Sequence, residues 1–125
     1  MSTSILIADD DPVVRHILSA VLEGAGYTVF AVETGQACME TLHRGALPDL
    51  LFLDIQLPGM DGLEVLARLR ATGRPIPPVL ALTALAMEGD RERILGAGAD
   101  AYLSKPAPLA VLGKEIDRLL ATRRS

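Results

Sequence analysis

Apolar and polar positions alternate along this chain with two different periods. Short apolar runs are each followed by a longer segment in which apolar residues recur at helical spacing. The runs predict five strands, over Ser4–Ala8, Thr28–Val32, Leu50–Leu53, Val79–Leu82 and Ala101–Leu103. The longer segments predict helices from Pro12 to about Gly24, from near Thr34 to before Gly45, from about Asp61 to Leu69, around Glu88 to Leu95, and over Leu109 to Leu120.

The regular alternation of strand and helix defines the expected fold class. The runs are apolar at successive positions, so we expect the strands to be buried on both faces. Such strands belong to a parallel sheet with helices on each side, which is a three-layer α/β architecture. The chain has no low-complexity tract or linker, and its 125 residues are enough for one buried core. We therefore expect a single domain over residues 1–125.

Composition and charge exclude several classes of function. Acidic residues outnumber basic ones by 16 to 12, there is no Trp, and Phe and Tyr contribute two residues each. A nucleic-acid surface needs basic patches and aromatic stacking platforms, so we expect no nucleic-acid partner. The chain shows no signal segment and no apolar run of membrane-spanning length, so we expect a cytoplasmic protein without membrane insertion.

The cysteine and the histidines offer no separate site. Cys38 is the single cysteine and falls on an apolar helical stripe, so we expect a buried, inert thiol. His16 and His43 lie off the apolar stripes and are expected at the surface.

Polar residues gather where the predicted strands end. Ligands of an open parallel sheet bind beyond the carboxyl ends of its strands. The polar residues at those ends are Asp9, Asp10, Asp54, Thr83, Ser104 and Lys105. Asp11 is explained as a helix N-cap before Pro12, which leaves Asp9 and Asp10 available for function.

This set of side chains suits one kind of chemistry. Oxygen ligands without His or Cys favour a hard cation such as Mg²⁺ over zinc or copper. A carboxylate beside such an ion is a nucleophile toward phosphorus. Phosphoryl transfer needs alignment and neutralisation of oxygen charge, which Lys105 and Thr83 could supply.

Four segments together resemble the receiver domain of bacterial two-component response regulators. They are ILIADDD (5–11), LFLDIQLPGMDG (51–62), LALTALA (80–86) and GADAYLSKP (98–106), and the likeness extends over nearly the whole chain. The resemblance implies a flavodoxin-like fold of CheY type, with five strands in the order 2-1-3-4-5.

The resemblance also implies a role for each acidic residue. Asp54 would accept a phosphoryl group from a phosphohistidine donor. Asp10 and Asp54 would bind Mg²⁺, or Mn²⁺ in its place, with the backbone carbonyl of Gln56 as a third ligand. Asp9 would act through water.

Further roles fall on the last two strand ends. The resemblance implies that Thr83, Ala84 and Lys105 contact the phosphoryl group and that Thr83 and Tyr102 form a switch pair. It also implies a cis peptide bond between Lys105 and Pro106. Tyr102 could equally be a half-buried sheet residue with a solvated hydroxyl.

Partners follow from the same resemblance. The donor would be a histidine kinase or a histidine phosphotransfer protein, and the chain would be a signalling domain rather than an enzyme. Phosphorylation would reshape the face made by the fourth helix, fifth strand and fifth helix, which would bind an unknown downstream protein. We expect a monomer or a phosphorylation-dependent dimer, and an output through protein contact or onward phosphotransfer.

Three other functions are weaker. A haloacid-dehalogenase-like phosphohydrolase has a second Asp two positions after its nucleophile, where this chain has Gln56. A flavin-binding electron carrier needs a phosphate-cradling loop after the first strand, where this chain has three carboxylates. A degenerate receiver used only for protein contact would not need the complete acidic site.

Overall fold

Five parallel strands form one sheet in the order β2-β1-β3-β4-β5, which confirms the predicted topology. The structure, a computed structural model, describes residues 3–44, 47–84, 89–105 and 107–122. The strands are β1 (Ser4–Ala8), β2 (Thr28–Val32), β3 (Leu50–Asp54), β4 (Val79–Thr83) and β5 (Ala101–Ser104). The helices are α1 (Pro12–Gly24), α2 (Gly35–His43), α3 (Gly62–Ala71), α4 (Asp90–Gly96) and α5 (Leu109–Thr122).

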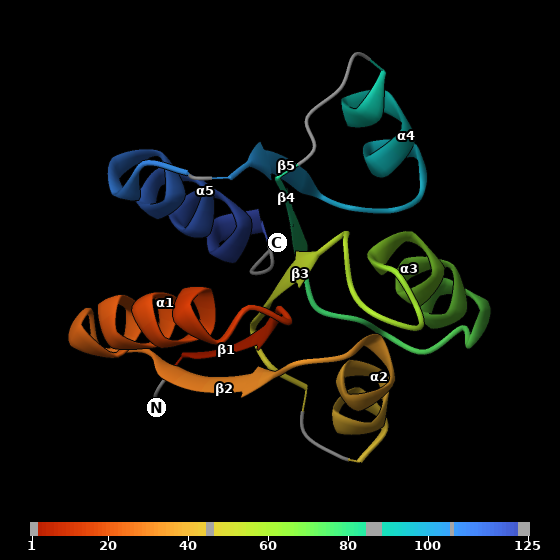
Figure 1. Cartoon of the computed structure of the whole chain (residues 1–125), viewed down its shortest axis with the longest axis horizontal. Coiled ribbons are helices and arrows are strands. Elements are labelled where there is room, and N and C mark those ends of the chain that lie inside the picture. The colour runs from red at the N-terminus through yellow and green to blue at the C-terminus, as the bar shows by residue number, and fades with distance from the viewer. Residues whose placement is uncertain (1–2, 45–46, 85–88, 106, 123–125) are drawn as a thin grey trace.

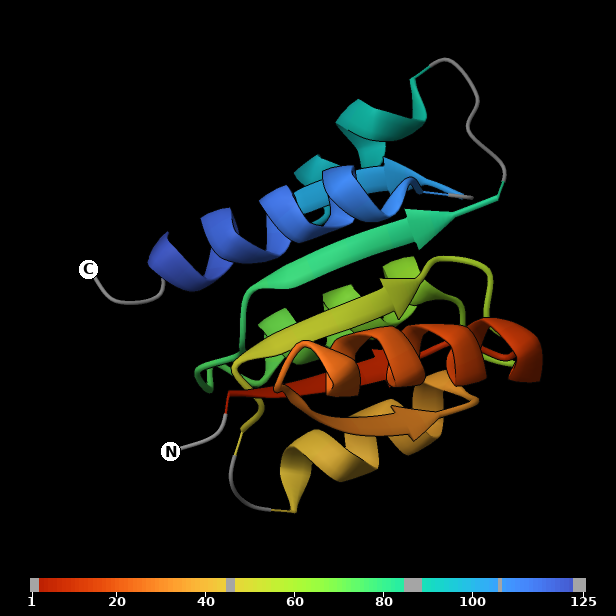
Figure 2. The same cartoon turned by 90° about the vertical axis from the view of Figure 1, so that its left-hand side faces the viewer.

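The sheet lies between two layers of helices. Figure 1 shows α1 and α5 on one face and α2, α3 and α4 on the other. All five strand arrows point the same way in Figure 2, so their carboxyl ends meet at one edge of the sheet. The polar residues predicted at the strand ends therefore lie at that edge, either as the last residue of a strand or in the loop after it.

Two apolar cores fill the spaces between the layers, and β3 contributes to both. Leu51 and Leu53 pack into the core beneath α2, α3 and α4. Leu50 and Phe52 face the opposite core, beneath α1 and α5. Successive side chains of a strand point to opposite faces, so a run that is apolar at every position serves both cores.

Side-chain caps fix the first turns of three helices. The carboxylate of Asp11 accepts hydrogen bonds from two backbone N–H groups of α1. Thr34 caps α2 through the N–H of Ala37, and Asp61 caps α3 through the N–H of Glu64. By contrast, α4 begins after Gly89, which provides no side-chain cap.

The loop after β3 is held closely between its neighbours. A Cβ atom on Gly62, at the start of α3, would lie 2.7 Å from the backbone oxygen of Asp54. A Cβ atom on Gly35, at the start of α2, would lie 2.6 Å from the backbone oxygen of Met60 in this loop. Only glycine allows such close backbone contact, and it keeps the end of β3 next to two helix starts.

The expectation that every strand is buried on both faces is wrong in part. The edge strand β2 is not covered on both faces, and Phe30 is 56% exposed. On α1, the apolar stripe reaches the core through Leu22, but Val13 and Ile17 are 62% and 52% exposed. Helical periodicity indicates that apolar residues share one face of a helix, but it does not show whether the core of the protein covers that whole face.

The expectations for the cysteine and the two histidines are confirmed. Cys38 is buried, and burial raises the pKa of its thiol to about 12. Both His16 and His43 are exposed. The fourth helix begins at Asp90, and Glu88, where it was expected to begin, lies outside the described residues. In the ranges described, no helix has the length and apolar character needed to cross a bilayer.

The two Phe residues predict a clear contrast in stability. Phe52→Ala should lower the free energy of unfolding by roughly 3–5 kcal/mol, because Phe52 is fully buried and its removal leaves a cavity. Phe30→Ala is the matched control on the exposed edge strand and should cost less than about 1 kcal/mol. Urea denaturation followed by circular dichroism measures both, and equal losses would contradict the placement of Phe52 in the core and Phe30 outside it.

Candidate functional site

Asp9 and Asp10 form the first part of a site at the carboxyl edge of the sheet. Asp9 directly follows β1 and is 1% exposed, whereas Asp10 is exposed. The N–H of Asp9 donates to the carbonyl of Val32 at 3.1 Å, which ties this turn to the end of β2. The Asp9 carboxylate accepts a 2.9 Å hydrogen bond from the N–H of Asp11. Hydrogen bonding therefore fixes Asp9 on both its backbone and its side chain.

Asp54 is the last residue of β3, and its carboxylate is fully engaged. It is 4% exposed. One oxygen, Oδ1, accepts a 2.9 Å hydrogen bond from the N–H of Gln56. The other, Oδ2, accepts a 2.9 Å hydrogen bond from the ammonium group of Lys105. A buried carboxylate at the end of an apolar strand is thus compensated by a charged partner.

Lys105 joins the two halves of the site. Its Nζ donates to Asp9 Oδ2 at 2.5 Å as well as to Asp54. Its backbone N–H donates at 2.8 Å to the carbonyl of Thr83, the last residue of β4, which is 2% exposed. The last residues of β3 and β4 and the residues directly after β1 and β5 therefore meet at one point.

Burial and ion pairing shift the pKa values of Asp54 and Lys105 in opposite directions. Burial raises the pKa of Asp54, and Asp9 adds to this rise, while the Gln56 N–H and Lys105 oppose it. For Lys105, burial lowers the pKa, but hydrogen bonds from its ammonium group to Asp9 and Asp54 outweigh burial, so the pKa is raised from 10.5. Lys105 therefore remains charged at neutral pH.

The acidic cluster has the chemistry of a divalent-cation site. Asp9, Asp10 and Asp54 each offer a carboxylate oxygen, and these oxygens lie within 4.8 Å of one another. The ammonium group of Lys105 bonds to two of these three carboxylates, so the cluster keeps excess negative charge. Oxygen-only donors with excess negative charge suit Mg²⁺ or Mn²⁺. The predicted ligands are therefore close enough together to share one ion.

The remaining predicted residues are less firmly placed in the site. The N–H of Gln56 faces Asp54, and the role of its carbonyl as a metal ligand stays a prediction. Ala84 is exposed next to Thr83. Tyr102 is half-buried and packs against the core beneath α2, α3 and α4, which is compatible with a switch residue and with an ordinary sheet residue. Pro106, and with it the expected cis peptide bond, lies outside the described residues.

Sequence reasoning missed Arg15. Its guanidinium Nη1 donates to the carbonyl of Asp9 at 2.8 Å, and its Nη2 lies 3.8 Å from Glu33, after β2. Arg15 is four residues after the N-cap Asp11, so it lies on the helix face one turn further along. That spacing could have indicated that Arg15 lies near the acidic turn, but a single Arg on a helix is usually a solvated residue.

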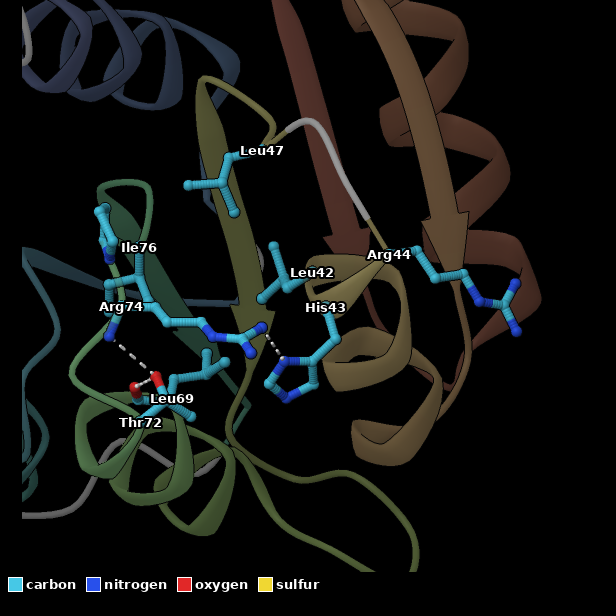
Figure 3. A pocket seen from close by; sticks show the side chains of 9 residues that line it. Leu42, His43, Arg44, Leu47, Leu69, Thr72, Arg74 and Ile76 are labelled. Atoms are coloured by element: carbon cyan, nitrogen blue, oxygen red, sulfur yellow. Dashed lines mark hydrogen bonds between the residues drawn. The ribbon is translucent and has the colours of Figure 1, made fainter.

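A separate hollow lies at the opposite edge of the sheet and is lined mainly by apolar and basic residues instead of carboxylates. It has a volume of about 260 Å³ and is lined by the last turns of α2 and α3 and the loop before β4. Figure 3 shows the Arg74 guanidinium reaching across it to His43, at 3.4 Å from Nδ1. The residues lining this hollow include no carboxylate, so it has no candidate phosphoacceptor.

Comparison with known proteins assigns the family. A family model described as the response regulator receiver domain matches residues 5–117. Response regulator MprA of Mycobacterium ulcerans is 42% identical over 120 residues, which are 96% of this chain and 51% of MprA. The transcriptional regulatory protein TctD of Salmonella typhimurium is 43% identical over 121 residues, 97% of this chain and 52% of TctD.

Solved structures agree with this assignment. The BeF3-activated N-terminal receiver domain of Klebsiella pneumoniae RstA has a TM-score of 0.86 and 33% identity, covering 94% of this chain and 97% of that one. The receiver domain of a Francisella response regulator has a TM-score of 0.89 and 25% identity, covering 97% and 98%.

The fold and the acidic edge define a receiver-type signalling domain. This chain belongs to the response regulator receiver domain family of two-component systems. Domains of this family are signalling modules, bind Mg²⁺ in an acidic pocket and are phosphorylated by histidine kinases. The chain spans about half the length of the curated relatives it matches. The description of TctD as a transcriptional regulator concerns that longer protein, and the absence of a nucleic-acid partner stays a prediction for this chain.

The raised pKa of Asp54 predicts how stability depends on pH without Mg²⁺. Between the unfolded and folded pKa values the folded state holds a proton that the unfolded state has lost, so stability falls as the pH rises. Each unit of pKa difference is worth about 1.4 kcal/mol. Asp54→Asn cannot ionise and should therefore be more stable than the wild type at pH 7, with a difference that shrinks toward pH 4.

Urea denaturation between about pH 4 and 8 in EDTA measures this difference. Asp61→Asn is the matched control, because Asp61 is an exposed helix cap and Asn caps helices about as well as Asp. A wild type as stable as Asp54→Asn throughout this range would show that burial of Asp54 carries no penalty.

Proposed function

We propose that this chain is a phosphoacceptor domain in which Asp54 receives a phosphoryl group from a phosphohistidine. The single observation that carries the proposal is the placement of the buried Asp54 carboxylate. It lies at the carboxyl edge of the sheet, within 4.8 Å of two further carboxylates, and it bonds to Lys105 at 2.9 Å. This arrangement supplies a nucleophile, a cation site and a fixed positive charge together.

The chemistry proceeds by substitution at phosphorus. An oxygen of the Asp54 carboxylate forms a bond to phosphorus while the P–N bond of the donor breaks. The electron pair of that bond returns to the imidazole of the donor, and the product is an acyl phosphate. Lys105 Nζ, which now donates to Asp54, would donate to a phosphoryl oxygen instead. Thr83 and the backbone N–H of Ala84 would contact another.

The acidic cluster would hold the metal ion in this reaction. Asp10 and Asp54 would bind Mg²⁺ or Mn²⁺ directly, with the Gln56 carbonyl, and Asp9 would act through water. The cluster of oxygens within 4.8 Å supports this assignment. The ion would neutralise phosphoryl oxygens during transfer.

The conformational change that carries the signal to a downstream protein would begin at Thr83. This residue is buried at the site and ends β4, and the chain continues from it toward α4. Tyr102 lies on the adjacent strand β5, in register with Ala81. Phosphorylation would shift a pre-existing equilibrium through this pair and reshape the α4-β5-α5 face for a downstream protein. The uncapped start of α4 supports a helix whose position is easily altered.

The phosphodonor would dock on α1 and α5. A donor must bring its phosphohistidine to Asp54, so its contact surface must lie around the carboxyl edge. An apolar hollow of about 220 Å³ borders Lys105 there. Its lining includes Ile17 of α1 and Leu109 of α5, which are 52% and 59% exposed. Exposed apolar side chains of this kind mark protein interaction surfaces.

Direct phosphorylation tests the proposed acceptor. Incubation with Mg²⁺ and acetyl phosphate should add the mass of one phosphoryl group to the intact protein, because the site itself supplies alignment and charge neutralisation. Asp54→Asn and a chelator should each abolish the gain. If folded, Mg²⁺-bound wild type stays at its original mass with acetyl phosphate and with a phosphohistidine donor, the contact-only function replaces this proposal.

A substitution on α1 tests the proposed docking surface. Ile17→Glu should slow phosphotransfer from a phosphohistidine protein at least about tenfold, since a charge would be buried at the contact. It should leave phosphorylation by acetyl phosphate unchanged. Phe30→Glu is the control, because Phe30 is similarly exposed but lies on β2. Equal transfer rates for Ile17→Glu and the wild type, measured by loss of radiolabel from the donor, would remove α1 from the docking surface.

A further inference from the structure

Arg15 links the acidic turn after β1 to the end of β2. Its side chain leaves the first turns of α1 and is only 22% exposed, unlike a solvated surface arginine. Nη1 donates to the carbonyl of Asp9 at 2.8 Å, and Nη2 lies 3.8 Å from the Glu33 carboxylate, which is 70% exposed. Arg15 therefore makes its short hydrogen bond to the turn after β1, and its contact with the exposed Glu33 is longer.

The bonded carbonyl belongs to the peptide unit between Asp9 and Asp10. A peptide unit is planar, so fixing its oxygen also fixes the direction in which the chain enters Asp10. Asp9 has further anchors, through its N–H to Val32 and its carboxylate to Asp11 and Lys105. The Asp10 carboxylate is exposed, so its placement depends on the backbone that carries it.

The charge of Arg15 and its hydrogen bond would have opposite effects on the affinity of the site for a divalent cation. A guanidinium group close to a divalent-cation site repels the ion. Arg15 bonds to a backbone oxygen and approaches Glu33, and so leaves the carboxylate oxygens of the acidic cluster to other partners. A purely electrostatic role would therefore weaken ion binding, whereas a positioning role would strengthen it.

We propose that Arg15 is a positioning residue for the metal ion, which holds the Asp9–Asp10 peptide so that the Asp10 carboxylate stays directed into the acidic cluster. This inference rests on the proposed function, because it concerns the ion that the phosphoacceptor site would hold. Groups that orient metal ligands typically contribute about 10–100-fold to metal affinity.

Calorimetric titration of the whole chain with Mg²⁺ tests the sign of the effect. Arg15→Met removes the donor and the charge at similar length, and should weaken Mg²⁺ binding by about tenfold. Arg15→Lys keeps the charge but replaces the planar guanidinium group, and should show an intermediate loss. Arg118→Met is the control, because Arg118 is an exposed cation in the second half of α5, paired with Glu115, and should leave the affinity unchanged.

Each outcome supports or overturns the positioning role. Equal or tighter Mg²⁺ binding by Arg15→Met would overturn it, since loss of the charge alone tightens binding. If Arg15→Met does not fold, wild-type affinity in Arg15→Lys would overturn it instead. A wild type that is folded but binds no Mg²⁺ would defeat the proposed metal site itself. Weaker binding in both variants, at a temperature where each is fully folded, would confirm the inference.

Discussion

The bridge from the Lys105 ammonium group to the carboxylates of Asp9 and Asp54 is the interaction on which the site depends. Two nearly buried carboxylates repel each other and lose solvation, and one shared cation makes their approach tolerable. Because Asp9 follows β1 and Asp54 ends β3, the bridge requires both strands and β5 to finish at the same level. The parallel register provides that alignment, with Ala8 opposite Leu53 and Thr83 opposite Ser104.

The site and the core share the same strands without sharing side chains. On β3, Leu50 to Leu53 are fully buried in the two apolar cores, and the next residue, Asp54, is the candidate acceptor. Gly62 and Gly35 then bring two helix starts against the loop that follows it. A rigid strand end surrounded by close backbone contacts gives the acceptor a defined position. Helix α4 and the exposed faces of α1 and α5 lie outside that centre.

The sequence predicted the strands, the cap at Asp11 and the gathering of Asp9, Asp54, Thr83 and Lys105, because these depend on local pattern and on sheet topology. It did not predict the exposure of Phe30, because the apolar pattern of Thr28–Val32 by itself indicates burial on both faces, although the strand order implied by the resemblance places this strand at the sheet edge. The Arg15 contact was also missed. Its partner is a backbone carbonyl, and every residue has one, so no residue type marks it.

The separation of the bridged residues has a consequence for synthesis of the protein. Asp9 and Lys105 lie 96 positions apart in the chain, and Asp54 lies 51 positions before Lys105. A growing polypeptide has both carboxylates long before it has their shared cation. The site can therefore assemble only once β5 and the residue after it have left the ribosome and joined the sheet. A partly made chain that ends before Lys105 therefore lacks the shared cation, and the bridge can form only after all five strands have been made.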